Sequence, residues 1–557
     1  MRAFVSLLLL CGAAFAQADT APTFTVADVH MSPPTAIPAT KGPFFGGGRY
    51  EIHYATMIDL IHAAYGVDPD HVYGGPNWLE YDRYDVLALA PPNSTAETRK
   101  LMLQSLLADR FGLTVHKDSK PMTAYVLKAG TSTKLQESAG GSGCNFKIEN
   151  MPAPGPPPAP GEDRPPMQIP TLAYTCQGAT MAKLAETLAN APGANGYFDN
   201  KPVVDQTELK GTYDFTFRYT PKIPPNIAVK GESIPIFDAV EKQLGLKLEL
   251  STAPLPVIAV DSAHEKPSAN LPDVAKSFPP IPTEFDAAEI KPSDSKRAGN
   301  VMPEIKNGRV LLPGIDLKSL VLIAWDFSPN DDSVLVNAPK WLNSARYDII
   351  AKAPAGVALG DLTPSSNKQF PVNLDALLPM LKNLLIERFK MQVHTEERPV
   401  NVYTLIAVKP KMQKADPSTR TKWLNGAADG QKDTRSSNQA LGRYVTCQNM
   451  TMAQFAKLLQ EIAPGYVHND VIDATGLEGG WTFTLNFSAL GQLRGGGRDG
   501  GGGAASAGPS DGGASDPTGA VSLPDAISRQ LGLKLEQQKR PMPVLVIDHI
   551  EEKPTDN

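Results

Sequence analysis

Apolar residues recur at helical spacing in several parts of the chain. Over residues 181–188 they occupy positions i, i+3, i+4 and i+7, and residues 452–459 repeat this spacing. Such a pattern is typical of a helix that buries one face. A wider apolar stripe over residues 374–385 predicts a third helix, and Pro379 inside it predicts that this helix starts late or bends there.

Other segments have the hydrophobic pattern of strands. Residues 544–547 form a continuous apolar run, which suits a strand buried on both faces. Residues 212–217 and 481–485 alternate aromatic and polar side chains, as half-exposed strands do. Shorter helical patterns at 236–244 and 524–531 each end before a glycine, a common residue just after a helix. Because helices and strands mix without regular alternation, we predict the α+β class, with mixed sheets and several amphipathic helices.

The same blocks of sequence occur twice and in the same order. Arg83-Tyr-Asp-Val86 returns as Arg346-Tyr-Asp-Ile349, and the run Gln-Leu-Gly-Leu-Lys-Leu-Glu occurs at 243–249 and at 530–536. The other paired blocks are 24–29 with 285–290, 76–79 with 339–342, 106–111 with 384–389, 205–211 with 473–479, and 265–267 with 552–554. Chance would not preserve the order of so many blocks, so the chain is a tandem duplication of one α+β module.

The repeats divide the chain into two modules. We expect module one at residues 19–270, a linker rich in proline at 271–280, and module two at 281–557. A proline-rich insertion at 151–170 occurs only in module one, and a Gly/Ser-rich insertion at 491–519 occurs only in module two. Because neither insertion has a counterpart in the other module, neither is needed for the shared fold.

The N-terminus has the pattern of a secretory signal peptide. Arg2 precedes an apolar run at 5–14, and the segments 14–16 and 16–18 both have the small-x-small pattern of a cleavage site. The run is too short to span a bilayer, and no later stretch reaches that length. We therefore expect residues 1–18 to be removed and the mature chain to be periplasmic or secreted, with no membrane span.

Net charge argues against one class of binding partner, and the cysteine content allows one disulfide. A net charge of -6 argues against a nucleic-acid partner, because nucleic-acid proteins usually carry a basic face. Cleavage of the signal peptide leaves Cys144, Cys176 and Cys447. In an oxidising compartment we expect a disulfide between Cys144 and Cys176, since both lie in module one. The alternative is three buried, unpaired cysteines.

Known catalytic and metal-binding motifs are missing from the sequence or stand in the wrong context. There is no His-Glu-x-x-His, paired Cys-x-x-Cys or Walker loop, so we predict no metal site and no cofactor. Gly508–Gly512 matches Gly-x-Ser-x-Gly, but a nucleophile elbow needs a strand before it and a helix after it, and this copy lies in the Gly/Ser tract.

The duplicated polar residues are better candidates for a site. His116 and His394 follow Asp109 and Glu387 at the same interval, and a histidine near a carboxylate can serve as a base or a ligand. The setting of a helix followed by a strand favours a capping or surface ion-pair role over catalysis.

Two further duplicated pairs have both a structural and a functional interpretation. Asp205 and Asp473 are each followed by a threonine and then a glycine, which favours a tight turn over ligand binding. Trp78 and Trp341 each follow a proline and precede Arg-Tyr-Asp, and we expect core or rim anchors in preference to sugar-stacking platforms.

Taken together, the blocks at Gly74–Trp78, Leu106–His116, Asp205–Gly211 and Gln243–Pro267 resemble an uncharacterised family of soil-associated proteins, found in large paralogous sets chiefly in acidobacteria. The resemblance covers nearly the whole mature chain. Glu208 departs from the family pattern, which has glycine there, and this departure predicts a different backbone geometry for the first turn. Ala338 likewise replaces the glycine that precedes the proline.

The resemblance implies a binding role, because the family has no established activity and related copies are fused to antirepressor-type membrane metallopeptidases. We therefore predict a free-standing, exported binding, interaction or sensor-type protein, whose partner is an envelope protein or a cell-wall ligand. The alternative is an extracytoplasmic hydrolase. It would need His116 or His394 beside a carboxylate, with a nucleophile in a cleft.

Overall fold

The computed structural model describes residues 21–33, 39–141, 143–149, 167–191, 193–198, 201–222, 229–293, 303–329, 331–362, 372–426, 435, 441–469, 471–490 and 519–555. The expected signal peptide at 1–18 and the motif Gly508–Gly512 lie outside these ranges, as does most of each insertion.

Two compact units make up the described chain, and they do not follow the sequence repeat. One unit runs up to His116 and resumes at Ala259, and the other is Lys117–Ile258. The first half of module one therefore belongs with module two, while its second half is a separate unit. The expected linker at 271–280 contains a one-turn 3-10 helix, Val274–Ser277, whose first residue is buried. Repeats record duplication, whereas compact units record which surfaces bury each other, so the two need not coincide.

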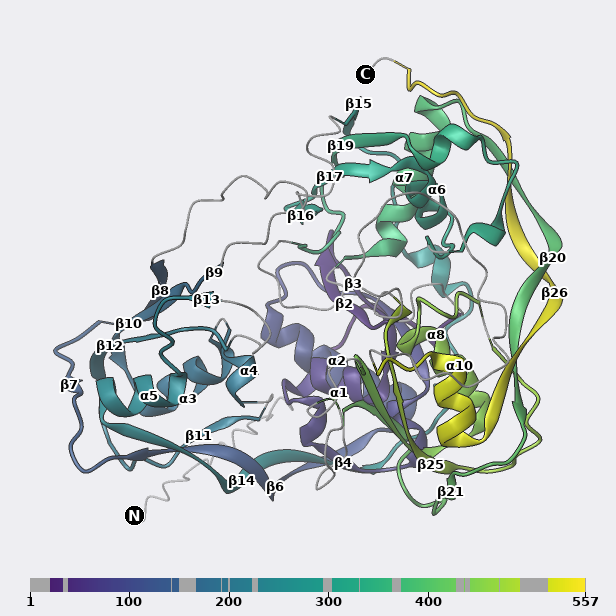
Figure 1. Cartoon of the computed structure of the whole chain (residues 1–557). Coiled ribbons are helices and arrows are strands. Elements are labelled where there is room, and N and C mark those ends of the chain that lie inside the picture. The colour runs from purple at the N-terminus through teal and green to yellow at the C-terminus, as the bar shows by residue number, and fades with distance from the viewer. Residues whose placement is uncertain are drawn as a thin grey trace, which may run out of the picture. The chain divides into compact units, whose positions relative to one another are not determined.

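Each module contains the same three four-stranded sheets within the described residues (Figure 1). The first sheet has the order β1 (Val26–Met31), β5 (Arg83–Leu89), β3 (Arg49–Thr56), β2 (Lys41–Gly46), repeated as β15 (Ala287–Pro292), β19 (Arg346–Lys352), β17 (Arg309–Asp316), β16 (Glu304–Lys306). The second has the order β7 (Gln136–Glu137), β12 (Tyr213–Tyr219), β10 (Thr171–Ala179), β8 (Gly143–Glu149), repeated as β21 (Gln413–Lys414), β25 (Trp481–Phe487), β23 (Arg443–Met450), β22 (Lys422–Asn425). The third has the order β11 (Val203–Asp205), β6 (Thr114–Ala129), β14 (Leu246–Ser262), β4 (Val72–Gly74), repeated as β24 (Ile472–Asp473), β20 (Gln392–Ala407), β26 (Leu533–His549), β18 (Leu335–Val336). The identical strand orders confirm that the two modules share one α+β fold.

Each helix that the apolar spacing predicts is present, and the first sheets also carry helices that it did not predict. The first sheets carry α1 (Met57–Tyr65) and α2 (Ala96–Phe111) in module one, and α6 (Leu317–Ala324) and α7 (Leu374–Arg388) in module two. The second sheets carry α3 (Met181–Asn190) with α5 (Ile236–Ala239) and η3 (Val240–Leu244), and α8 (Met452–Ile462) with α10 (Leu523–Ala526) and η8 (Ile527–Leu531). Of the two alternatives predicted for the helix containing Pro379, a late start or a bend, the late start is excluded: the side chain of Asn373 caps α7 by accepting from the amide of Ala376, ahead of the proline.

A long two-stranded ribbon joins the halves of module two. β20 and β26 pair antiparallel from Gln392 with His549 to Ala407 with Leu533 (Figure 1), a span of roughly 50 Å at the usual rise per residue. At one end Leu545 and Ile547 enter the core of the first half, and at the other Leu405 and Leu533 enter a separate core. Module two is therefore bipartite, with one core at each end of the ribbon.

The Arg-Tyr-Asp block clamps a β-bulge in the neighbouring strand. Arg83 Nη1 donates to the carbonyl of Tyr54 (3.2 Å), and Asp85 Oδ1 accepts from the amide of the same residue (2.8 Å). In module two the equivalent arginine and aspartate bind Gly314 in the same way, at 3.0 and 2.7 Å. Both bulge residues have positive φ, 56° at Tyr54 and 60° at Gly314. The first and third residues of the block thus satisfy two backbone groups that the bulge removes from the sheet ladder.

The middle tyrosine of the block binds the Glu-Lys-Pro segment near the end of its module. Tyr84 is fully buried, its ring packs edge-on against Phe111 at 4.9 Å, and its hydroxyl donates to the carbonyl of Glu265 at 2.6 Å. In module two Tyr347 makes the equivalent contacts at 5.1 and 2.8 Å. The repeated Glu-Lys-Pro segment therefore serves as an acceptor for a buried hydroxyl that would otherwise be unsatisfied.

The Asp-x-Thr turns have the same geometry in both modules. Asp205 Oδ1 accepts from the amide of Thr207 at 2.9 Å and from its hydroxyl at 2.8 Å, and the equivalent bonds at Asp473 have the same lengths. The expectation of a different backbone at Glu208 is wrong: its φ is 59°, against 65° for Gly476. The side-chain hydrogen bonds of the turn hold Glu208 in the left-handed region, despite the steric penalty on its Cβ.

We predict that Glu208→Gly stabilises the protein. The substitution removes a left-handed non-glycine residue whose side chain is exposed, and we expect the free energy of unfolding to rise by about 0.5–1 kcal/mol. Gly476→Ala is the reciprocal control: an added Cβ meets no atom within 4 Å, so backbone strain alone should lower stability by about 1 kcal/mol. Urea denaturation measures both, and effects of equal sign would contradict the shared geometry.

Candidate functional site

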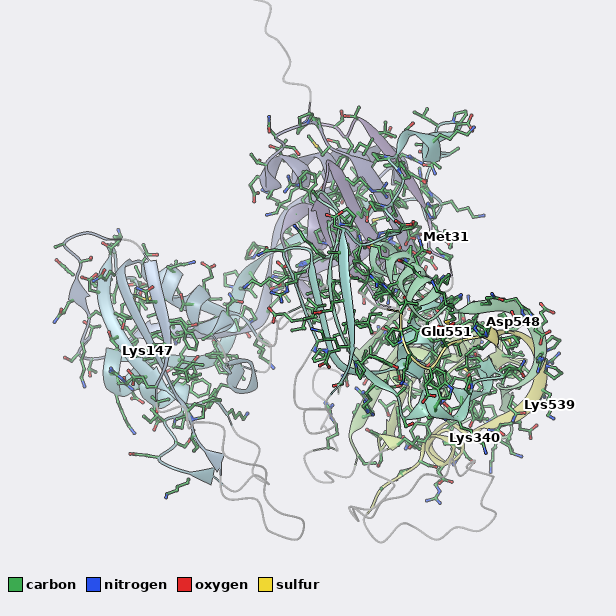
Figure 2. All side chains as sticks on the ribbon, turned by 90° about the horizontal axis from the view of Figure 1, so that it is seen from above. Met31, Lys147, Lys340, Lys539, Asp548 and Glu551 are labelled. Carbon is green, nitrogen blue, oxygen red and sulfur yellow. A yellow bond between two sulfur atoms is a disulfide. The ribbon has the colours of Figure 1, made fainter. Side chains whose placement is uncertain are left out.

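The duplicated histidines form surface ion pairs on the ribbons. His116 Nδ1 lies 3.0 Å from a carboxylate oxygen of Asp261, and His394 Nδ1 lies 2.8 Å from Asp548, with all four side chains about half exposed. Figure 2 shows Asp548 at the surface. The carboxylate partners are thus on the neighbouring strand, not in the preceding helix. Neither histidine lines either of the two pockets of the described chain discussed below.

The other duplicated candidates lie in structural positions. Asp205 and Asp473 are used within their own turns. Trp78 is half-buried, with its ring 6.2 Å from Tyr84 and edge-on to it, and Trp341 packs against the core of the first half of module two.

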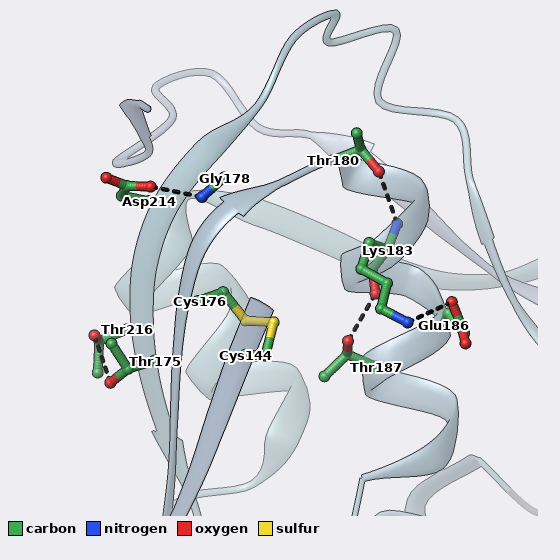
Figure 3. The surroundings of a disulfide bond; sticks show 10 residues. All are labelled: Cys144, Thr175, Cys176, Gly178, Thr180, Lys183, Glu186, Thr187, Asp214 and Thr216. Atoms are coloured by element: carbon green, nitrogen blue, oxygen red, sulfur yellow. Dashed lines mark hydrogen bonds and ion pairs between the residues drawn. A yellow bond between two sulfur atoms is a disulfide. The ribbon is translucent and has the colours of Figure 1, made fainter. Parts of the chain in front are cut away.

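Cys144 and Cys176 form a disulfide across the neighbouring strands β8 and β10, beside α3 (Figure 3). Cys447 takes the place of Cys176 in module two, where it is free and fully buried, and burial raises the pKa of its thiol. Its cross-strand neighbour is Trp423, so an indole stands where module one has Cys144. One position in the fold is therefore filled by a covalent link in one module and by an aromatic ring in the other.

A pocket of about 190 Å³, here called the inter-module pocket, lies between the first half of module one and the second half of module two. Module one contributes Met31–Pro33, Tyr54 and Glu80–Arg83, and module two contributes Trp423, Lys457, Leu458, Gln460 and Glu461. Met31, at the end of β1, is half exposed (Figure 2). On α8 the polar lining residues Lys457, Gln460 and Glu461 lie outside the helix's own buried stripe, to which the lining residue Leu458 belongs. The helix thus packs into its module on one side and presents polar groups to the pocket on the other.

Arg420 fastens the two modules beside this pocket. Its Nη1 donates to the carbonyl of Val72 and to Glu80 Oε1, both at 2.9 Å, and its side chain is 16% exposed. Tyr81 adds a hydrogen bond from its hydroxyl to the carbonyl of Gln454 at 3.2 Å. These contacts bring residues far apart in the sequence into one surface.

Carboxyl groups in the inter-module pocket have raised pKa values. Burial, and next the charge of Glu265, raises the pKa of Asp82 to about 6. Burial also raises the pKa of Glu461, with Asp59 adding to the effect and Arg83 opposing it. Titratable groups perturbed in this way gather at functional sites more often than elsewhere.

Tyr54 lines the same pocket in a strained backbone conformation. At the equivalent bulge position module two has Gly314, which adopts a positive φ without steric cost. Tyrosine there costs about 1–2 kcal/mol. Its ring lies under the guanidinium of Arg83, with Cζ 5.3 Å from the ring centroid. Strain kept at the wall of a pocket is a reason to suspect a function for the side chain.

A buried ion network lies on the same strand, β3, where it faces module two. Glu51 accepts from Arg49 Nε at 2.5 Å and from Asn373 Nδ2 at 2.7 Å. His53 Nε2 is 3.4 Å from Glu51, and its Nδ1 is 3.0 Å from Asp375, an ion contact whose angle does not make a hydrogen bond. A second pocket, of about 180 Å³, is lined by Arg49, Glu51 and Asn373 together with residues of the linker.

The network fixes the charges of its members. Burial alone would raise the pKa of Glu51, but hydrogen bonds from His53 and Arg49 outweigh it and lower this pKa to about 2. Burial alone would lower the pKa of His53, but the carboxylate of Asp85, 3.8 Å away, the hydrogen bond to Glu51 and the charge of Asp375 raise it to about 9. At neutral pH the network therefore holds an ionised glutamate beside a protonated histidine.

Sequence reasoning missed these residues because it looked for what the modules share. Glu51, His53 and Tyr54 correspond to Leu311, Pro313 and Gly314 in module two, so they occur in one copy only. The sequence signal that could have found them was a difference between the copies. Glu51 and His53 are charged or titratable residues at alternate positions of a strand that has Leu311 and Pro313 in module two.

Comparison with known families shows what the chain belongs to, but supplies no activity. The model of the family "Protein of unknown function (DUF3738)" matches residues 58–263 and 318–550, so the chain belongs to this family and carries its domain twice. No curated protein and no solved structure matches it. Within the described residues, no helix is long and apolar enough to cross a membrane, and no group of three or more His, Cys, Asp or Glu side chains is placed to hold a metal ion.

The ion network predicts a stability maximum in mildly acidic solution. The folded-state pKa of His53 is raised from 6.5 to about 9, so its contribution is complete below pH 6.5 and is lost as the pH rises through 9. The folded-state pKa of Glu51 is lowered from 4.5 to about 2, so its contribution is complete above pH 4.5 and is lost as the pH falls through 2. Between pH 6.5 and 10 we expect a loss of about 2–3 kcal/mol of unfolding free energy in urea denaturation.

His53→Gln is the variant that tests this assignment. It should flatten the pH dependence between 6.5 and 10, while the half-exposed His30, changed to Gln, serves as the matched control and should leave it in place. An unchanged alkaline slope in His53→Gln would show that another group carries it.

Proposed function

We propose that this chain is an exported, non-catalytic binding protein whose ligand site is the inter-module pocket. The observation that carries the proposal is that repeated residues hold the fold, whereas residues found in one module only line the pocket. The repeated blocks hold bulges, turns and chain ends in both modules. The pocket is lined by both modules and contains Tyr54, Trp423 and Glu461, which lack an equivalent of the same type in the other copy.

The retained strain at Tyr54 supports a ligand role for the pocket. A glycine at this position would keep the bulge and its two backbone hydrogen bonds, as module two demonstrates. The bulge itself therefore does not need a tyrosine. What the tyrosine adds is an aromatic wall and a surface for Arg83, and both are features of a binding surface.

Hydrolysis is supported less well than binding. Ser32 is a hydroxyl in the pocket, and it donates to Asp85 at 2.5 Å instead of to a histidine. Burial would raise the pKa of Asp85, but the imidazole of His53, 3.8 Å away, and hydrogen bonds from Ser32 and the amide of Tyr54 lower it, which makes this carboxylate a weak base. The exposed pairs at His116 and His394 stand beside neither pocket. A hydrolase at the duplicated histidines therefore stays the second reading.

Export is part of the proposal and is supported by the signal-peptide pattern of residues 1–18. For an exported chain we propose an envelope protein or a cell-wall ligand as partner. Expressed with its own N-terminus in a Gram-negative host, the protein should appear in the periplasmic fraction. Its mass should be that of a chain that begins at Gln17 or Asp19. Leu8→Arg interrupts the apolar run and should leave the full-length form in the cytoplasm. Intact mass spectrometry of both fractions decides, and an uncleaved wild-type chain in the cytoplasm would contradict export.

Filling the inter-module pocket should abolish ligand binding. Lys457→Trp places an indole at the pocket wall from an exposed position of α8, and Glu186→Trp is the matched control at the equivalent position of α3. We expect fragments found by ligand-observed NMR on the wild type to lose at least about tenfold in affinity, roughly 1.4 kcal/mol, in Lys457→Trp only. Fragments that bind both variants equally would place the site elsewhere.

A further inference from the structure

The inter-module pocket has more carboxylates than cations. Glu80, Asp82 and Glu461 line it, against Arg83 and Lys457. Glu80 is already bound by Arg420, a residue outside the lining, at 2.9 Å. The negative charge that remains for a ligand is therefore that of Asp82 and Glu461.

Arg83 does not neutralise this charge fully. Its guanidinium is shared between Glu461 at 3.8 Å and Asp59 at 3.6 Å, both longer than a hydrogen bond. Its closer contacts go to neutral oxygens, the Thr40 hydroxyl and the Tyr54 carbonyl, at 3.1 and 3.2 Å. One guanidinium for two carboxylates leaves an unbalanced charge on the module-two side of the pocket, where Glu461 is less than one third exposed.

Asp82 carries the unbalanced charge on the other side. Its neighbours are Glu265, a like charge, and the exposed Lys457. The raised pKa values of Asp82 and Glu461 have like charges among their causes. An added positive charge would relieve both carboxyls, whereas an added anion would increase the repulsion.

The walls of the pocket suit an organic cation in particular. Tyr54, Tyr81 and Trp423 are the aromatic residues among those that line this space of about 190 Å³. Aromatic faces attract alkylammonium groups through the ring quadrupole, with tryptophan the strongest of the three residue types in this role. The Arg83 guanidinium over the Tyr54 ring, at 5.3 Å, already uses this attraction within the protein.

We propose that the inter-module pocket binds a small organic cation, an alkylammonium group held between the carboxylates of Asp82 and Glu461 and the rings of Tyr81 and Trp423. This inference rests on the proposed function, since it names the ligand class of the same pocket. Binding is linked to protonation: the cation favours ionised Asp82, so affinity increases as the pH rises through about 6, by at most tenfold for each pH unit below it.

Charged and uncharged probes of equal shape test the ligand class. Choline is paired with 3,3-dimethylbutan-1-ol, and butylammonium with butan-1-ol, and binding to the full chain is measured by ligand-observed NMR at pH 5 and pH 7.5. We expect at least one cation to bind more than tenfold more tightly than its neutral partner, and more tightly at pH 7.5 than at pH 5.

Three variants assign the charge to its residues. Asp82→Asn should weaken the cation at least tenfold at pH 7.5 and remove most of the pH dependence, Glu461→Gln should weaken it and keep most of the pH dependence, and Glu97→Gln, at an exposed position of α2, should change neither. Thermal unfolding checks that each variant folds, and Glu461→Gln carries the test should Asp82→Asn not fold.

The outcomes distinguish a wrong ligand class from a wrong ligand site. Neutral partners that bind as tightly as the cations, in a manner blocked by Lys457→Trp, would overturn the cation class and leave the pocket as a ligand site. If fragments and cations bind the Lys457→Trp variant as tightly as the wild type, both the cation class and the pocket as a ligand site are overturned.

Discussion

Both modules depend on one local interaction, the clamp that an arginine and an aspartate place on the bulge of the neighbouring strand. A bulge removes an amide and a carbonyl from the sheet ladder, and each would cost about 1–3 kcal/mol if it stayed buried and unpaired. Asp85 and Arg83 satisfy both groups at Tyr54. The clamped strand continues directly into α1, whose N-cap is Thr56. The bulge thus determines which side chains of β3 face the core, which face module two and which line the inter-module pocket.

The two copies differ in burial at the strand positions where they differ in charge. In module one the face of the first sheet that bears Glu51 and His53 is covered by the start of α7, so these charged side chains are almost fully buried. Buried charges are tolerated only when they are paired and hydrogen-bonded, and Arg49, Asn373 and Asp375 supply the partners. Module two, with Leu311 and Pro313 at these positions, needs no such network. The pocket differs from the network because its carboxylates are incompletely paired.

The second halves show a related difference. The second half of module one is a compact unit of its own, and its edge strand is linked to the next strand by Cys144 and Cys176. The second half of module two packs against the first half of module one, and Trp423 replaces the cysteine at the wall of the shared pocket. A small domain with limited core gains from a covalent link, whereas a domain that buries a second surface gains from apolar contact. Each solution matches the surroundings of its module.

The sequence by itself determined the duplication, the class of fold and the positions of the amphipathic helices, because spacing and repeated blocks are local properties of the chain. It also singled out the tight turns and the surface pairs of His116 and His394, although it assigned the histidines the wrong carboxylates. Only the tertiary structure decided that the compact units cross the repeats, that Glu208 adopts the backbone of glycine, and that Tyr54, Asp82 and Glu461 share a pocket. The physical reason is that burial and charge pairing depend on which surfaces meet, and α8 meets Tyr81 and Arg83 across hundreds of intervening residues with no local signal of their contact.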